Sequence, residues 1–340
     1  MKHRFRGERL SRRQLLARGG ALAAAGAASL AAPGAGATGG SHHGQFHGGL
    51  GLDHGGNLVV GDVDLSVFDP TAYLTNFDYG KVSTLPDGRT LREYELVASD
   101  REIEVAPGVK FAAWTYNGQV PGPTLRCTEG DRLRIHFVNA GSHPHTIHFH
   151  GMHAANMDGV FEVVAPRGEY TYEFDAEPFG LHLYHCHVPP LRRHIHKGLY
   201  GVFIIDPPKP RPPALELVMT MNGFDTNFDA ENEVYAVNTV AFHYVRHPIR
   251  LRVGELVRIY LVNMTEFDPV NSLHTHANFF REYRTGTSLT PNNFTDITVL
   301  GQAERAILEL TYKFPGTFMF HAHQTEFSEL GWTGMFEVVT

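Results

Sequence analysis

The feature of this sequence that most restricts its fold is an internal repeat. Residues 251–263 repeat the pattern of residues 127–139, so that Gly254 corresponds to Gly130 and Asn263 to Asn139. Four His-x-His pairs recur in the same order, two in each half of the chain, at offsets of 126 and 136 residues: His148/His150, His185/His187, His274/His276 and His321/His323. Ordered positions that recur in this way are typical of duplicated structural units. We therefore predict two tandem domains with the same architecture.

Apolar and polar side chains alternate within the first copy. Leu133, Ile135 and Phe137 alternate with polar or charged residues across residues 132–139, which is the period of a strand with one buried face. Asn-Gly, Pro-Gly and Glu-Gly pairs interrupt the chain every few residues and predict turns. We expect an all-β fold of two tandem Greek-key β-sandwiches.

Composition suggests the domain boundaries. The prolines of residues 207–213 cannot pair inside a sheet and predict a stiff linker. This linker separates a first domain, residues 101–206, from a second domain, residues 214–340. Residues 38–100 begin with a Gly- and His-rich stretch and are predicted to be an N-terminal extension.

Residues 1–37 resemble a twin-arginine export signal. Arg12-Arg13 is preceded by basic residues and followed by an Ala- and Gly-rich run that ends at Ala35-Gly36-Ala37, a small-residue cleavage site. The run is too short and too weakly apolar to predict a membrane span, and we expect export to the periplasm or the exterior. The formal net charge of −7 becomes more negative without this basic leader, which argues against nucleic acid as a partner.

The segment Tyr184-His185-Cys186-His187 places a cysteine between two histidines. In a strand the sulfur points to one side and both imidazoles to the other, so one strand end can serve two metal sites. The chain has 22 His and 2 Cys, a ratio that favours metal binding over a disulfide. We interpret Cys186 as a metal ligand and Cys127 as a small buried core residue.

These motifs resemble those of the multicopper oxidases, specifically the two-domain, laccase-like members related to the copper nitrite reductases. The resemblance covers roughly residues 105–340 and implies cupredoxin-like domains. It also implies a blue, type 1 copper in the first domain, bound by His145, Cys186 and His194 with Leu199 in the axial place. Leu199 offers no lone pair, which favours Cu(I) and a higher potential than an axial Met would give.

Two further histidines compete for the type 1 site. His143 and His196 lie close in sequence to His145 and His194, but only the latter pair has the spacing of the family. Ala322 occupies the position of Cys186 in the second half, so we expect no type 1 copper there.

The eight paired histidines resemble the ligands of a trinuclear copper cluster, which gives four coppers per subunit. The resemblance assigns His148 and His274 to a type 2 copper and the other six to a type 3 pair: His150, His185, His187, His276, His321 and His323. Neutral imidazole suits copper, whereas structural zinc or calcium sites use more thiolate or carboxylate. Each domain supplies four of the eight histidines. We therefore expect the cluster to form between subunits of a ring, and the resemblance implies a homotrimer.

The activity implied by the resemblance is oxidation of phenols, aromatic amines or metal ions, one electron at a time, with reduction of O2 to water. Asp158 and Glu326 are candidates for a proton relay. For each of them a purely structural carboxylate in a turn is an equally good interpretation.

Two alternatives remain open from the sequence. Copper nitrite reductases share the domains and the trimer, but they have an acidic residue where His148 stands, lack the second His of His-Cys-His, and use an axial Met. The spacing of eight residues from Cys186 to His194 is nevertheless closer to their loop than to that of ordinary laccases. A non-enzymatic copper-storage or electron-transfer protein would need only the type 1 site and leaves the duplicated histidines unexplained.

Overall fold

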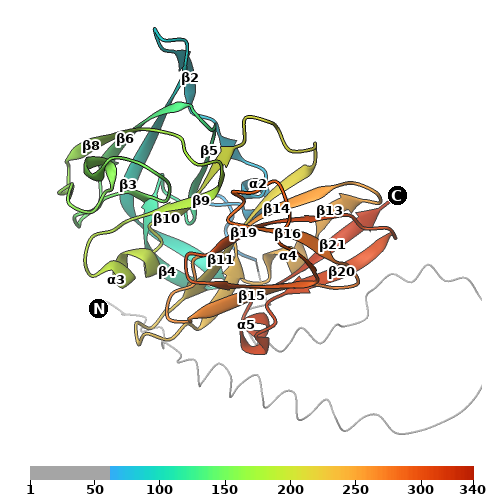
Figure 1. The fold of residues 1–340 in the computed structure, drawn as a ribbon. Helices are drawn as coiled ribbons and strands as arrows, with labels where there is room; N and C mark the ends of the chain where they lie inside the picture. The colour runs from blue at the N-terminus through green and yellow to red at the C-terminus, as the bar shows by residue number, and fades with distance from the viewer. Residues whose placement is uncertain (1–61) are drawn as a thin grey trace, which may run out of the picture.

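The computed structural model describes residues 62–340. Two β-sandwich domains lie side by side, the first cyan to green and the second yellow to red in Figure 1. The predicted all-β fold is thus confirmed. The predicted export signal and the Gly- and His-rich lead-in up to residue 61 lie outside the described residues.

The first domain has two sheets. One contains, in spatial order, β1 (Phe77–Asp78), β5 (Gly122–Thr128), β10 (Tyr200–Asp206), β9 (Gly180–His185) and β7 (His148–Phe149). The other contains β2 (Lys81–Thr84), β3 (Thr90–Ala106), β6 (Arg132–Asn139) and β8 (Glu169–Asp175), with β4 (Val109–Tyr116) paired to β3. Short helices connect the strands: α2 (Pro70–Tyr73), the 3₁₀ helix η2 (Ala155–Met157) and α3 (Leu191–His196).

The second domain also has two sheets. One contains β12 (Val234–Val237), β11 (Leu215–Phe224), β14 (Val257–Asn263), β19 (Arg305–Leu310), β16 (Phe280–Arg284) and β17 (Asn293–Thr295). The other contains β13 (Ile249–Arg252), β21 (Thr333–Val339), β20 (Gly316–His321), β15 (Val270–Thr275) and β18 (Ile297–Gly301). Its helices are α4 (His243–Arg246) and α5 (Thr325–Glu329).

The sequence repeat is also present in the strand pairing. β6 pairs in parallel with β3, and β14 pairs in parallel with β11. His148 on β7 lies opposite His185 on β9, and His274 on β15 lies opposite His321 on β20. Equivalent register therefore brings the paired histidines together at one end of a sheet in each domain.

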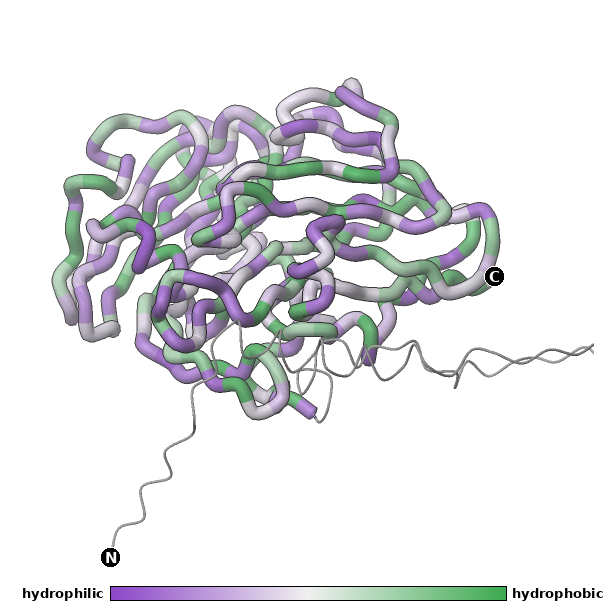
Figure 2. The backbone as a smooth tube through the Cα atoms, turned by 90° about the horizontal axis from the view of Figure 1, so that it is seen from below, coloured by the Kyte–Doolittle hydropathy of each residue, from purple (hydrophilic) through white to green (hydrophobic). Residues whose placement is uncertain are grey.

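Burial follows the alternation predicted from the sequence. Along β6 the side chains of Leu133, Ile135 and Phe137 are buried, while their neighbours are partly exposed or polar. Hydrophobic and hydrophilic segments interleave along the strands of both domains (Figure 2). One buried apolar cluster joins the domains, since it includes Phe111 and Leu183 of the first with Met219 and Leu261 of the second. The two domains therefore share part of their core.

The predicted boundary at residue 100 falls within β3. Residues 91–98 pair in parallel with β6, and β1 and β2 pair with β5 and β3, so residues 77–100 belong to the sheets of the first domain. The proline-rich segment 207–213 lies between the end of β10 and the start of β11. Within the described residues, no helix has the length and apolar character needed to cross a membrane.

Candidate metal centres

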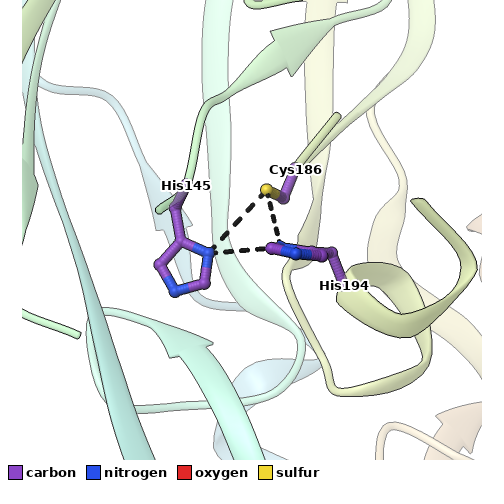
Figure 3. A group of neighbouring side chains, drawn as sticks. All are labelled: His145, Cys186 and His194. Atoms are coloured by element: carbon purple, nitrogen blue, oxygen red, sulfur yellow. Dashed lines mark hydrogen bonds between the residues drawn. The ribbon is translucent and has the colours of Figure 1, made fainter. Parts of the chain in front are cut away.

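His145, Cys186 and His194 come together in the first domain (Figure 3). Cys186 Sγ lies 3.2 Å from Nδ1 of His194 and 3.9 Å from Nδ1 of His145, and the two Nδ1 atoms are 3.3 Å apart. All three residues are buried. Donor atoms separated in this way surround a point about 2 Å from each of them, the usual length of a metal–ligand bond.

The backbone around Cys186 sets this geometry. Cys186 follows β9, and its N–H donates to the carbonyl of Leu199 at 3.0 Å. The N–H of Leu199 in turn donates to the carbonyl of His194 at 3.2 Å, at the end of α3. The N–H of Thr146 donates to Sγ at 3.4 Å. The side chain of Leu199 is completely buried in the same apolar cluster as Cys186 and offers no atom with a lone pair.

The electrostatics of this group favour metal binding. Burial lowers the pKa of both His145 and His194 to about 4, so the rings are neutral near pH 7 and keep a lone pair for a metal. Burial also raises the pKa of the Cys186 thiol, and a bound cation would replace its proton. Nε2 of His145 is buried without a hydrogen-bond partner among the described residues. The polar contacts of the His145 ring are therefore made by its Nδ1 atom, with Sγ of Cys186 and Nδ1 of His194.

The competing histidines point elsewhere. The ring of His143 packs on Trp114 with centroids 4.6 Å apart, and its Nδ1 lies 2.8 Å from Oγ of Ser142. His196 faces the second domain, where its Nε2 accepts a hydrogen bond from the N–H of Asp225 at 3.1 Å. Trp114 was not singled out from the sequence, yet it packs on His145 and His194 as well.

Four histidines of the first domain form a second group at the end of β7 and β9. The ring of His148 lies between 5.2 and 5.3 Å, centroid to centroid, from each of the other three: His150, His185 and His187. Nε2 of His150 and Nε2 of His185 are 3.3 Å apart. Burial lowers the pKa of His150 to about 2 and that of His185 to about 4, so both rings are neutral.

The second domain repeats this group. The ring of His274 lies 5.1–5.5 Å, centroid to centroid, from the other three histidines: His276, His321 and His323. Nε2 of His276 and Nε2 of His321 are 3.0 Å apart. His276 and His323 are exposed on the surface, and burial lowers the pKa of His276 and of His321.

Backbone carbonyls orient four of these rings. Nδ1 lies within hydrogen-bonding distance of a carbonyl oxygen in His148 (Asp158, 2.8 Å), His185 (Cys186, 2.9 Å), His274 (Asp296, 2.9 Å) and His321 (Ala322, 2.6 Å). A carbonyl only accepts, so Nδ1 carries the proton and Nε2 keeps its lone pair. Metal-binding histidines are commonly oriented in this way. The donor set thus fits metal ions that prefer nitrogen ligands.

The comparison with known families shows the family to which the chain belongs. The family description multicopper oxidase matches residues 98–210 and, with a second model, residues 210–340. The chain belongs to the multicopper oxidase family. It is therefore a copper oxidoreductase, as the resemblance implied.

Solved structures and sequence relatives place this multicopper oxidase near two kinds of protein. A crystal structure of a multicopper oxidase is 58% identical, with a TM-score of 0.79 over 80% of this chain and 97% of that one. Copper nitrite reductase from Nitrosomonas europaea is 26% identical, with a TM-score of 0.67 over 74% of this chain and 94% of that one. Copper-containing nitrite reductase of Neisseria meningitidis serogroup A is 28% identical, and the match covers 66% of this chain and 63% of that protein.

The second domain has no thiol at the position that corresponds to Cys186. Ala322 stands where Cys186 does, and its N–H donates to the carbonyl of Trp332 at 3.2 Å, as that of Cys186 does to Leu199. The indole of Trp332 is fully buried at this place.

The structure also adds residues that sequence reasoning missed. The hydroxyl of Thr146 accepts from the N–H of His187 at 3.0 Å, and that of Ser272 accepts from the N–H of His323 at 2.8 Å. Thr146 and Ser272 each stand two residues before the first histidine of a pair, so the repeat itself contained this signal. Asp296 gave no signal, because it lies much further from His274 than Asp158 does from His148.

The two carboxylates proposed as proton relays differ in their surroundings. Oδ1 of Asp158 lies 3.1 Å from Nδ1 of His148, so this residue touches the histidine group of the first domain. The corresponding Oδ2 of Asp296 is 3.8 Å from Nδ1 of His274. Glu326 lies in the first turn of α5, which follows the His321/His323 pair.

Proposed function

We propose that this protein is a laccase-like oxidase. It takes single electrons from a phenol, an aromatic amine or a metal ion and reduces O2 to two waters with four coppers per chain. The observation that supports this most is the presence of a four-histidine group in each domain, and in the first domain two of these histidines flank Cys186 directly in the sequence. A site for electron transfer alone would need neither group.

The proposed ligands follow the groups seen in the structure. His145, Cys186 and His194 would hold the type 1 copper, with Leu199 in the axial place, while His148 and His274 would hold the type 2 copper. The type 3 pair would have six ligands: His150, His185, His187, His276, His321 and His323. Copper supplies the one-electron redox steps, and the protein keeps the imidazoles neutral, orients Nε2 and excludes water from the buried Cys186.

The complete cluster requires two subunits in this proposal. Within residues 62–340, no group of potential metal ligands combines histidines of both domains. His276 and His323 are exposed, and the exposed aromatic rings of Phe279, Phe294 and Phe314 line the same hollow as His276. Such a surface favours contact with another protein, and a homotrimer would bring the first domain of one subunit onto the second domain of the next. Light scattering of the copper-loaded protein tests the expected mass of three chains.

Copper nitrite reductase is the second candidate, because relatives of that name cover much of the chain. Two residues argue against it. His148 places an imidazole where those enzymes carry an acidic group, and Leu199 brings no sulfur to the type 1 group.

The decisive experiment is oxygen uptake by copper-loaded protein supplied with a phenolic or aromatic-amine donor. We expect one O2 consumed per four electrons, without peroxide. Protein that is blue but consumes no O2 would contradict the oxidase proposal, and reduction of nitrite by the same sample would then support the second candidate.

We also propose that residues 1–37 direct export through the twin-arginine route, on the basis of Arg12-Arg13 and the run that follows. Replacing both arginines with lysine should leave the chain unprocessed in the cytoplasm. Processing and export that continue unchanged would contradict this assignment.

A further inference from the structure

A cleft opens beside the helix that carries His194. It has a volume of about 480 Å³ and lies between α3 of the first domain and two segments of the second, residues 225–230 and Phe267. Figure 1 shows α3 at the edge of the first domain, next to the second. Small-molecule sites typically have volumes of this order and commonly form between domains.

Cations above aromatic rings line this cleft. Arg192 lies over the ring of Phe267 at 5.1 Å, and Lys197 lies 4.9 Å from the ring centroid of Phe228. Arg193 lines the cleft as well and stands over Trp114 at 5.2 Å. The surface thus offers both positive charge and flat apolar area, the chemistry that recognises an anionic aromatic molecule.

Basic side chains outnumber carboxylates in the lining of this cleft, with Arg192, Arg193 and Lys197 against Asp225, although the buried Glu266 also interacts with Arg192. Lys197 is 8% exposed and forms no ion pair with a described carboxylate. Burial lowers the pKa of its ammonium, and the nearby charges of Asp100 and Asp225 oppose this shift only in part. Asp225 is the carboxylate among the lining residues, and its oxygens already accept hydrogen bonds from three backbone N–H groups, those of Phe228, Asp229 and Ala230. A buried unpaired charge is costly, so a ligand anion would be favoured here.

Trp114 connects the cleft with the type 1 group. The guanidinium of Arg193 lies over the Trp114 ring on the side of the cleft, and the same ring packs on His194 with centroids 4.8 Å apart. A molecule seated in the cleft would be separated from the copper ligand by about one indole ring.

We propose that this cleft binds the electron donor and selects aromatic donors that carry a negative charge, such as phenols with a carboxylate or sulfonate group. The proposal rests on the oxidase function above and adds the donor class. A copper held by His145, Cys186 and His194 would accept one electron from a phenolic donor, which would also lose one proton to water and leave as a phenoxyl radical.

Binding is tested first with a probe that cannot be oxidised. Calorimetry on copper-loaded wild-type protein compares benzenesulfonate with benzenesulfonamide, which has nearly the same shape but no charge. We expect the sulfonate to bind at least tenfold more tightly, and added salt to weaken it. The double substitution Arg192→Gln/Arg193→Gln should lower the ratio of the two affinities about tenfold. The matched pair Arg250→Gln/Arg252→Gln, at exposed positions of β13, should leave this ratio unchanged. Equal affinity for both probes would overturn the proposal.

Donor oxidation gives the second test. Syringate and 2,6-dimethoxyphenol share the reacting ring and differ by a carboxylate. The ratio of their kcat/KM values should fall about tenfold in the Arg192/Arg193 variant and stay constant in the Arg250/Arg252 variant. Turnover of both donors with an unchanged ratio would overturn the cleft assignment alone, whereas absence of turnover with any donor would overturn the oxidase function.

Discussion

At the scale of single residues, one sulfur atom distinguishes the two domains. Cys186 is buried against His145 and His194, whereas the second thiol, Cys127, is buried in the core with Sγ 3.8 Å from the carbonyl of Ile204. We predict that Cys186→Ser lowers the copper content from four to three per chain, abolishes the intense blue absorption and reduces O2 uptake at least a hundredfold. Cys127→Ala, the control, should keep both colour and copper. Colour that survives in Cys186→Ser would assign the blue site elsewhere.

Asp158 allows a relay role to be separated from a structural one. Its carbonyl and its carboxylate both lie near Nδ1 of His148, and Asp296 is placed similarly beside His274. Substitution by Asn retains the carbonyl contact and removes only the titrating group. We predict that Asp158→Asn slows turnover ten- to a hundredfold with unchanged copper content and an altered pH profile.

Asp296→Asn is the matched control for this experiment. A relay role predicts a large effect for Asp158 alone. Equal losses in both variants, without a change in pH profile, would assign both carboxylates to orienting the histidines.

At the scale of elements, the sequence predicts those strands and sites whose pattern lies in neighbouring residues, and it does not predict those that depend on contacts between distant residues. β6 was predictable because apolar and polar residues alternate along its consecutive positions. The histidine pairs were predictable because they occur in both halves of the chain. β1 and β2 were not predicted, since their short segments gain stability only by pairing with β5 and β3, far along the chain. Asp296 and Trp114 reach the histidines through folding alone.

The equivalence of β9 and β20 leads to a further prediction. In the second domain the fully buried Trp332 stands at the position that corresponds to Leu199, and Asn271, which donates to Thr265, stands at the position that corresponds to His145. We predict that Ala322→Cys adds no blue centre and no fifth copper. The larger side chain should instead cost about 1–3 kcal/mol in unfolding free energy. Copper analysis and urea denaturation check this, and an increase in blue absorption per chain would contradict it.

At the scale of the whole molecule, buried histidines at the domain contact make stability depend on pH. His196 bonds to the N–H of Asp225, and Nε2 of His243 lies 2.7 Å from Oγ1 of Thr71. Burial lowers the pKa of each to about 4, below the value near 6.5 expected when unfolded. Between these values the unfolded chain binds more protons, so stability falls as the pH drops from 6.5 to 4.

Each such histidine can contribute up to about 3 kcal/mol to this loss. Urea denaturation of copper-free protein at a series of pH values measures it. His243→Gln should make the dependence shallower, and a stability that does not change over this range would contradict the proposed cause.

The domains are also joined by a buried ionic network, which should make them unfold together. Arg126 on β5 binds both Asp206, at the end of β10, and Glu216 on β11 with two hydrogen bonds each, at 2.7–3.1 Å. Glu216 also accepts from Arg258 on β14. The side chain of Arg126 is only 9% exposed, whereas the ion pair between Arg250 and Glu337 is open to solvent.

Removal of Arg126 leaves Asp206 without its cation and Glu216 with Arg258 as its remaining cation, which costs far more than loss of a surface pair. We predict that Arg126→Met lowers the free energy of unfolding by about 3 kcal/mol, and that Arg250→Met lowers it by less than about 1 kcal/mol. The unfolding transition of Arg126→Met should broaden or divide in two, because Glu216 then no longer connects the second domain to β5. Similar losses in both variants, each with a single sharp transition, would show that the shared apolar core alone couples the domains.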